Sequence, residues 1–184
     1  MLSLALSPLA ARWTAVTPDP SLHTTCSKGT PFTFFVREGD AATSNLVFEL
    51  DGGGCCFNAV TCALPQFIAG VSKDVTLARL ASRGGIGDHS DSRNPVAGWT
   101  PVFVPYCTGD AHLGNKTASY GLHHMGPVNA GSATSRALEH AQAPQVVLTT
   151  GTSAGAVGPY VIRPPLMQHY PDARPLTFAV AHPP

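Results

Sequence analysis

Charged side chains are scarce in this sequence. Only 12% of its 184 residues are Asp, Glu, Lys or Arg, about half the usual share in globular proteins. The 11 basic residues balance the 11 acidic ones, so the chain lacks the electrostatic footprint of a nucleic-acid-binding protein. No apolar run reaches the roughly 18 residues that a membrane span requires. We therefore expect neither a nucleic-acid partner nor stable insertion into a membrane.

The amino-terminal stretch has little of what a signal peptide needs. Residues 1–12 contain a short apolar run and small residues, but no basic segment comes before the run. They are either the remnant of a signal segment or an ordinary frayed terminus. The remaining residues, 13–184, suffice for one domain with a sizeable core and are too few for two.

Cysteine patterns typical of zinc sites are missing. No Cys-x-x-Cys pair occurs, adjacent Cys55 and Cys56 cannot easily face one ion, and the histidines show no ligand spacing. We therefore expect no metal. The spacing of Cys56 and Cys62 allows a small disulfide loop, and Cys26 and Cys107 allow a long-range bridge. The alternative is ordinary buried thiols. Disulfides would indicate an oxidising compartment.

Strand and helix patterns alternate along the chain. Residues 31–38 and 44–50 read as an antiparallel pair of strands, followed by helical spacing in the second half of 66–80 and a loop over 83–99. A strand over 101–107, a helix over about 129–141, strands over 145–150 and 176–180, and a helix candidate through 161–170 complete the pattern. Prolines predict that this last helix is broken. The alternation indicates an α/β fold with a mostly parallel sheet and an antiparallel N-terminal pair.

A G-x-S-x-G pattern follows the strand over 145–150. Gly151, Ser153 and Gly155 lie between a strand and a helix, which is the context of a nucleophile elbow. Small flanking residues let strand and helix approach, and the amide of Ala154 would point at an oxyanion beside Ser153. The alternative is a small residue in a tight turn. A P-loop interpretation fails for want of a lysine, and a dinucleotide interpretation fails on glycine spacing, so we expect no cofactor.

A second glycine-rich stretch, "DGGGCC", follows the strand over 44–50. The amides of Gly53 and Gly54 are candidate oxyanion donors, as in the glycine-rich loops of esterases. Because ligands collect at the carboxyl ends of parallel strands, both stretches are expected at one edge of the sheet. Together they favour an acyl-transfer site over a chance serine turn.

Three motifs, "LDGGGCCFNAVTC", "VFVPYCTGDAHLGN" and "GTSAGAVG", carry a resemblance to the pectinacetylesterase family, which includes the animal Notum carboxylesterases. The resemblance runs over about 13–172. It implies an α/β-hydrolase-like fold and a secreted or periplasmic serine esterase. Such an enzyme removes acetyl groups from polysaccharide or, in the Notum branch, a fatty acyl group from protein.

The resemblance also assigns residues. It implies Ser153 as nucleophile, with the amides of Gly53, Gly54 and Ala154 as oxyanion donors. It implies a disulfide between Cys56 and Cys62, and Cys26 and Cys107 also match family cysteines. Asp110 and His112 become candidates for contact with the substrate; the alternative is that Asp110 caps a turn and His112 faces solvent. Cys55 stays without a role.

The acid and base of a serine triad are the missing parts. In α/β-hydrolases they follow the nucleophile as Asp or Glu and then His, and the resembling family places both far downstream. After Ser153, Asp172 and His182 come in this order, but the interval leaves no room for the strands that carry such residues. We therefore expect residues 13–184 to be the N-terminal portion of a single α/β-hydrolase-like domain with an incomplete C-terminal half. Three hypotheses follow: a serine esterase, a catalytically incomplete carbohydrate-binding domain, and, least favoured, a histidine metal site.

Overall fold

A six-stranded sheet forms the centre of the computed structural model, which describes residues 13–40 and 43–180. Its strands lie in the order β1 (Thr14–Val16), β2 (Phe34–Val36), β4 (Thr100–Val104), β3 (Leu46–Leu50), β7 (Val146–Thr152) and β8 (Arg174–Val180). The β1–β2 and β2–β4 pairs are antiparallel, and the other three pairs are parallel. The prediction of a mostly parallel sheet with an antiparallel N-terminal pair is confirmed.

The predicted pairing of strands 31–38 and 44–50 is wrong. β2 pairs with β1 and β4, while β3 lies between β4 and β7 and is parallel to both. All five residues of β3 are buried. A short strand that is buried on both faces is typical of the centre of a parallel sheet, where each face is covered by helices. The turn-rich link after β2 therefore makes a crossover instead of a hairpin.

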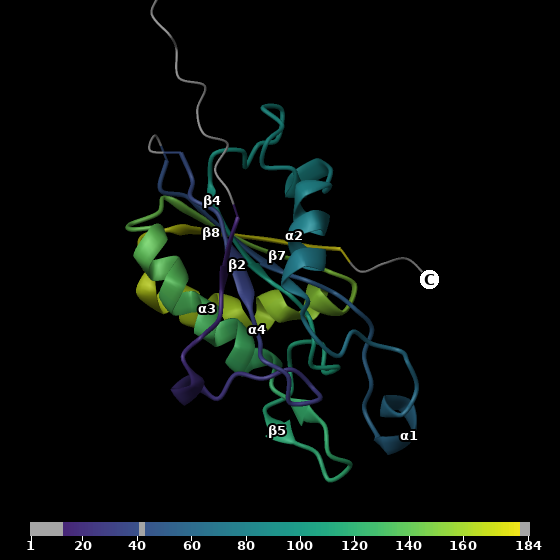
Figure 1. Ribbon diagram of the computed structural model, residues 1–184. Coiled ribbons are helices and arrows are strands. Elements are labelled where there is room, and N and C mark those ends of the chain that lie inside the picture. The colour runs from purple at the N-terminus through teal and green to yellow at the C-terminus, as the bar shows by residue number, and fades with distance from the viewer. Residues whose placement is uncertain (1–12, 41–42, 181–184) are drawn as a thin grey trace, which may run out of the picture.

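Helices cover both faces of the sheet. α3 (Gly126–His140) and α4 (Gly158–His169) pack on one face, and α2 (Lys73–Ala81) packs on the other (Figure 1). The alternation of β2 shows this directly, since Phe34 and Val36 join the α3–α4 side of the core and Phe35 joins the α2 side. The layers form the three-layer arrangement of an α/β domain.

The smaller elements lie mainly in the connecting loops. They are α1 (Ala59–Cys62), the two-stranded sheet of β5 (Lys116–Thr117) and β6 (His123–His124), and the 3-10 turns η1 (Pro20–Leu22), η2 (Gly85–Gly87) and η3 (Ser153–Val157). Figure 1 shows α1 and β5 together at one end of the molecule. No helix among the described residues is both long and apolar enough to cross a bilayer.

α4 is continuous, which corrects the prediction of a broken helix. Pro164 and Pro165 both lie inside it. Each removes a backbone hydrogen bond, and its ring crowds the preceding turn. Both prolines are exposed, whereas Ile162 and Leu166 are buried against the sheet. Tertiary packing of the buried face therefore holds the helix through the two prolines.

β8 is the edge strand of the sheet on the parallel side. It pairs with β7 along its whole length, from Val146 opposite Arg174 to Thr152 opposite Val180. Of its apolar side chains, Leu176, Phe178 and Val180 are exposed. Within the part of the chain that the structure describes, neither a further strand nor a helix covers this edge.

Candidate active site

Ser153 lies at the sharp turn between β7 and α4. It begins the 3-10 turn η3, and its φ of 54° is in the left-handed region. Residues other than glycine avoid this region unless the surrounding structure enforces it, and such strain collects at functional sites. The side chain is exposed. The backbone conformation and the position after a parallel strand are those of a nucleophile elbow.

The two glycines that flank Ser153 are required by close backbone packing. A Cβ atom on Gly151 would overlap the carbonyl of Gly155, and a Cβ on Gly155 would overlap the carbonyls of Leu50 and Asp51 at the end of β3. The turn therefore packs both against β7, the strand that it follows, and against the neighbouring strand β3. Any side chain at these two positions would push the serine away from β3.

The glycine loop, residues 51–54, leaves the sheet beside this turn. β3 and β7 are parallel neighbours with Leu50 opposite Gly151, so both strands end at the same edge. A Cβ atom on Gly52 would overlap the carbonyl of Thr152 and lie 2.8 Å from the Cβ of Ser153. The sequence prediction that the two motifs meet at one edge is thus realised by direct contact.

The predicted oxyanion donors lie in these two segments. Gly54 has a φ of 78°, and a side chain there would overlap the carbonyl of Gln66. Among the described residues, the amides of Gly53 and Gly54 donate to no protein acceptor. The amide of Ala154 is in the first turn of η3, where helix geometry offers no partner. These amides belong to the two segments that meet where Gly52 contacts Ser153, and their role as oxyanion donors stays a prediction.

Asp51 anchors the start of the glycine loop through three different groups. Its amide donates to the carbonyl of Val104 at 3.0 Å, and its carbonyl contacts Nε2 of His112 at 2.9 Å. Its carboxylate pairs with Arg79 of α2. Sequence reasoning missed this residue. The available signal was a charged residue directly after an apolar strand.

The carboxylate of Asp110 accepts hydrogen bonds from its own loop and from the start of α3. It accepts from the Thr108 hydroxyl at 2.6 Å and from the amides of His112, Gly114 and Gly126 at 2.8 to 3.1 Å. The last of these belongs to the first turn of α3. The carboxylate also borders a cavity of about 410 Å³ between this loop, Phe57 and the β5–β6 sheet. Contact with a substrate stays a prediction for Asp110.

His112 lies in the interior beside the glycine loop. Its side chain packs on Tyr106 with ring centres 5.1 Å apart, and the residue is 2% exposed. The alternative of a solvent-facing histidine is therefore wrong. Burial lowers the pKa of the imidazole, and the hydrogen bond to Asp51 and nearby carboxylates only partly oppose this. Because its partner is a carbonyl oxygen, Nε2 donates to the Asp51 carbonyl, and Nδ1 is buried with no hydrogen-bond partner among the described residues.

A buried ionic cluster lies under α2. Glu49 of β3 pairs with Arg83 at 2.5 Å and with Nε2 of His89 at 3.0 Å. Burial acts to raise the pKa of Glu49, but the His89 hydrogen bond and the Arg83 charge outweigh it and the pKa lies below its usual value. Arg83 also lies 5.1 Å above the ring of Phe103. Sequence analysis missed this cluster as well.

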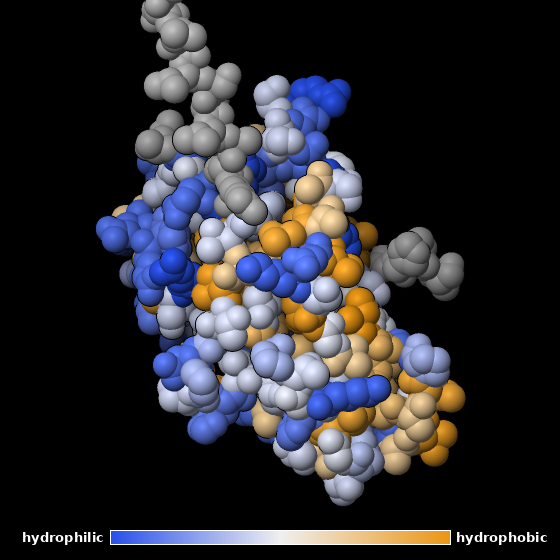
Figure 2. All heavy atoms as spheres, viewed as in Figure 1, coloured by the Kyte–Doolittle hydropathy of each residue, from blue (hydrophilic) through white to orange (hydrophobic). Residues whose placement is uncertain are grey.

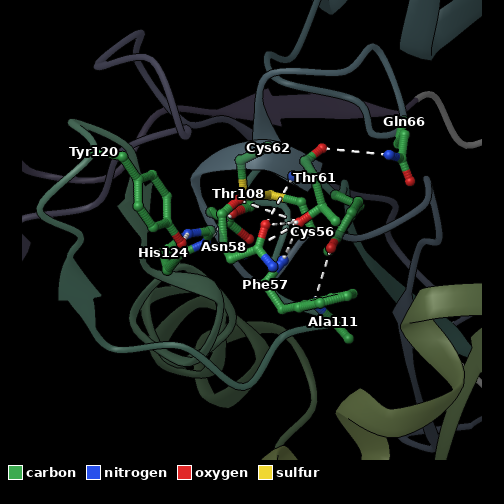
Figure 3. Close-up of a disulfide and its surroundings, with 11 residues drawn as sticks. Cys56, Phe57, Asn58, Thr61, Cys62, Gln66, Thr108, Ala111, Tyr120 and His124 are labelled. Atoms are coloured by element: carbon green, nitrogen blue, oxygen red, sulfur yellow. Dashed lines mark hydrogen bonds between the residues drawn. A yellow bond between two sulfur atoms is a disulfide. The ribbon is translucent and has the colours of Figure 1, made fainter.

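Two disulfides connect the loops around the site. Cys26 bonds to Cys107. Cys56 bonds to Cys62, as Figure 3 shows. Cys55 is free and exposed.

The sulfurs of Cys56 and Cys62 lie close to His124, but sulfurs in a disulfide are not thiolate ligands. Both nitrogens of His124 are also engaged, by the Thr108 carbonyl and the Tyr120 hydroxyl. This cluster is therefore structural.

Among the described residues, no hydrogen bond joins the Ser153 hydroxyl to a histidine or a carboxylate. His169 is the last residue of α4, and Asp172 lies in the turn between α4 and β8. Because β7 and β8 are parallel, this is the amino-terminal edge of the sheet, opposite Ser153. His182 lies outside the described residues. The ordering of Asp172 and His182 in sequence therefore does not bring an acid to the serine.

Exposed apolar side chains form a patch on and around α1. Figure 2 shows this apolar area over α1. Its members are Phe57, Val60 and Leu64, all at least half exposed. Apolar patches of this kind on a soluble domain are associated with binding of a partner or a substrate.

Comparison with known proteins identifies relatives of this arrangement. Residues 7–176 match the sequence profile of the family described as Pectinacetylesterase. Palmitoleoyl-protein carboxylesterase notum2 of Xenopus laevis is 31% identical over 148 residues, which are 73% of this chain and 28% of that protein. The chain thus spans well under half the length of this relative.

A second relative is shorter and carries a different description. Inactive palmitoleoyl-protein carboxylesterase notum1b of Danio rerio is 31% identical over 115 residues, which are 57% of this chain and 76% of that protein. Among solved structures, the Wnt deacylase Notum from Drosophila matches with a TM-score of 0.66 and 20% identity. That match covers 93% of this chain and 52% of the Drosophila chain, and it supports the α/β-hydrolase fold.

Proposed function

Because this chain belongs to the pectinacetylesterase family, we propose that it is a serine carboxylesterase with Ser153 as its nucleophile. The hydroxyl oxygen of Ser153 attacks the carbonyl carbon of an ester and passes its proton to a general base, which we place outside the described residues. The amides of Gly53, Gly54 and Ala154 stabilise the oxyanion. The intermediate collapses to an acyl-enzyme as the alcohol leaves with a proton, and water then releases the acid and restores the serine. The strained turn of Ser153 against Gly52 is the observation that carries this proposal.

The proposed substrate is an O-acetyl ester on a polysaccharide. The family description names acetyl ester chemistry, whereas the Xenopus relative is named for removal of a palmitoleoyl group. The acetyl ester is favoured because the family match covers residues 7–176 of this chain, whereas the match to the Xenopus relative covers 28% of that protein. We place the protein in a secreted or periplasmic compartment because its two disulfides persist in oxidising surroundings.

A fluorophosphonate probe tests the serine mechanism directly. Such probes phosphonylate an activated serine, so wild-type protein is expected to be labelled and Ser153→Ala is expected to lose the label completely. Ser119→Ala is the matched control, because Ser119 is also exposed but lies in the β5–β6 connection. Intact-protein mass spectrometry measures the added mass. Labelling that persists in Ser153→Ala would exclude Ser153 as the nucleophile.

The second candidate function is a catalytically incomplete domain that binds acetylated carbohydrate. It is favoured by one observation, the match to an inactive zebrafish relative over 76% of that protein's length. This candidate requires that 4-nitrophenyl acetate is hydrolysed no faster than by Ser153→Ala, while acetylated pectin still binds in calorimetry. A burst of 4-nitrophenolate equal to the protein concentration would rule it out.

A further inference from the structure

We propose that His112 is a positioning residue that fixes the glycine loop, residues 51–54, against Ser153. The inference rests on the proposed function for its catalytic consequence. It depends on one contact, the hydrogen bond from Nε2 of His112 to the carbonyl of Asp51 at 2.9 Å. The imidazole takes no direct part in acyl transfer, because that nitrogen is occupied by the loop and the ring is buried.

The peptide bond explains how one carbonyl can orient the start of the glycine loop. The carbonyl of Asp51 and the amide of Gly52 belong to the same rigid plane. A donor that fixes the carbonyl direction therefore also fixes the amide on the other side of the plane. The position of the Gly52 Cα atom is then fixed as well, and this atom faces the Cβ of Ser153. His112 thus determines how the backbone enters the segment with Gly53 and Gly54.

No other hydrogen bond among the described residues holds this peptide plane, although Gly155 packs against the same carbonyl. The amide of Asp51 bonds to Val104, which fixes the preceding plane at the end of β3. The next backbone bond runs from the amide of Ile68 to the carbonyl of Gly53, two planes beyond the Asp51–Gly52 plane. The Arg79 side chain that pairs with the Asp51 carboxylate is 43% exposed. Exposed pairs of this kind contribute little and do not hold a carbonyl in place.

The segment that presents His112 is itself held tightly. Ala111 and His112 have φ values of 52° and 59°. The amide of Ala111 donates to the Tyr106 hydroxyl at 2.8 Å, and the amide of His112 donates to Asp110 at 3.1 Å. Two successive non-glycine residues in left-handed backbone persist only where such contacts over-determine them. The strain therefore serves to aim the imidazole at the loop.

Selective 15N-glycine labelling gives a test that does not depend on catalysis. The 18 glycines report loop motion residue by residue. In His112→Phe, which keeps a ring but removes the donor, the order parameters of Gly52 and Gly53 are expected to fall from about 0.85 to below 0.6. In His112→Gln, whose amide nitrogen replaces Nε2, they are expected to stay near the wild-type values. Fluorophosphonate labelling of Ser153 is expected to slow at least tenfold in the Phe variant and less than threefold in the Gln variant.

His89→Phe is the matched control. His89 is also buried, also donates or accepts through Nε2 and also has an unpartnered Nδ1, but its partner is Glu49. This change should leave Gly52 and Gly53 rigid. Should the Phe variant of His112 not fold, His112→Asn replaces it, since the shorter amide does not reach the carbonyl.

Two results would overturn the proposal: a rigid loop in the donor-free variant, or a Gln variant as mobile as the Phe variant. If wild-type protein is not labelled by the fluorophosphonate, the proposed function falls, and the order parameters still decide the role of His112.

Discussion

The backbone of Ser153 is in a conformation that most residues avoid, and its neighbours enforce it. A non-glycine residue at a φ of 54° is strained by on the order of 1–3 kcal/mol. The strain persists because Gly155 lets η3 lie directly on the carbonyls of Leu50 and Asp51. The serine and its flanking glycines therefore work as one unit, in which contact with β3 keeps the serine in place.

Gly155→Ala is expected to destabilise the protein by about 1–3 kcal/mol, the usual range for overpacking a filled site. The added methyl group would overlap two backbone carbonyls, which cannot move as a flexible side chain can. The turn would shift away from β3, and fluorophosphonate labelling of Ser153 would fall with it. Urea denaturation measures the change in the free energy of unfolding.

Gly131→Ala provides a control of opposite sign. Gly131 lies inside α3 with open space around it. Alanine there is expected to stabilise the helix by about 0.5–1 kcal/mol, because glycine loses more conformational freedom on folding. Equal effects of the two substitutions would contradict the packing argument at Gly155.

Sequence reasoning reached Ser153 and the glycine loop because their signals are local. The G-x-S-x-G spacing and the glycine run each describe one turn after one strand. It missed Asp51 as an anchor, and its alternative of a solvent-facing His112 is wrong, whereas contact of His112 with a substrate stays a prediction. Both misses have one cause: the Asp51–His112 contact joins residues 61 apart in sequence, and no short pattern records such a pair.

At the scale of elements, the strand pairing depends on burial on both faces. β3 was expected beside β2 because the link between them is turn-rich. The structure instead surrounds β3 with β4 and β7, which covers all of its side chains. Alternation, length and turn residues predicted that these strands exist, but not which strand lies beside which. That choice is made by the packing of α3, α4 and α2 on the complete sheet.

α4 offers a prediction about its internal prolines. Pro164→Ala is expected to stabilise the protein by about 2 kcal/mol. Proline in a helix interior is about 3 kcal/mol less favourable than alanine, and the greater freedom of the unfolded chain offsets about 0.4–1 kcal/mol of the gain. The side chain is exposed, so no buried packing is lost. Thermal and urea denaturation measure the change.

Pro171→Ala is the comparison for α4. Pro171 is exposed and lies in the turn between α4 and β8. Removing it should destabilise the protein by about 0.4–1 kcal/mol through the unfolded state. A Pro164→Ala variant that is no more stable than wild type would show that the continuous helix does not exist in solution.

At the scale of the whole molecule, the long disulfide connects the segment before β2 to the loop after β4, which borders the candidate active site. Cys26 precedes β2, and Cys107 follows β4. The amide of Ser27 also donates to the carbonyl of Cys107 at 2.8 Å. The segment that follows Cys107 contains Asp110 and His112, which contact α3 and the glycine loop. This bridge therefore supports the element that aims His112.

The two disulfides are expected to differ in their contribution to stability. The Cys26–Cys107 bridge closes a separation of 81 residues, and the Cys56–Cys62 bridge closes a separation of 6. Loop-closure entropy then gives about 4.5 and about 2 kcal/mol, respectively. Cys26→Ala with Cys107→Ala should thus lower the free energy of unfolding more than Cys56→Ala with Cys62→Ala, as measured by urea denaturation.

The same pair of variants separates the effect of a bridge on stability from its effect on the position of the glycine loop in the candidate active site. Cys55→Ala is the control for removal of a cysteine without loss of a bridge, and it should leave stability unchanged because Cys55 is free and exposed. Loss of the long bridge should also increase the mobility of Gly52, since the segment with His112 begins next to Cys107. If loss of the Cys56–Cys62 bridge lowers the free energy of unfolding more than loss of the Cys26–Cys107 bridge, the disulfides do not stabilise the protein through chain entropy. If Gly52 stays rigid without the long bridge, the hydrogen bonds of Asp110 suffice to hold that segment.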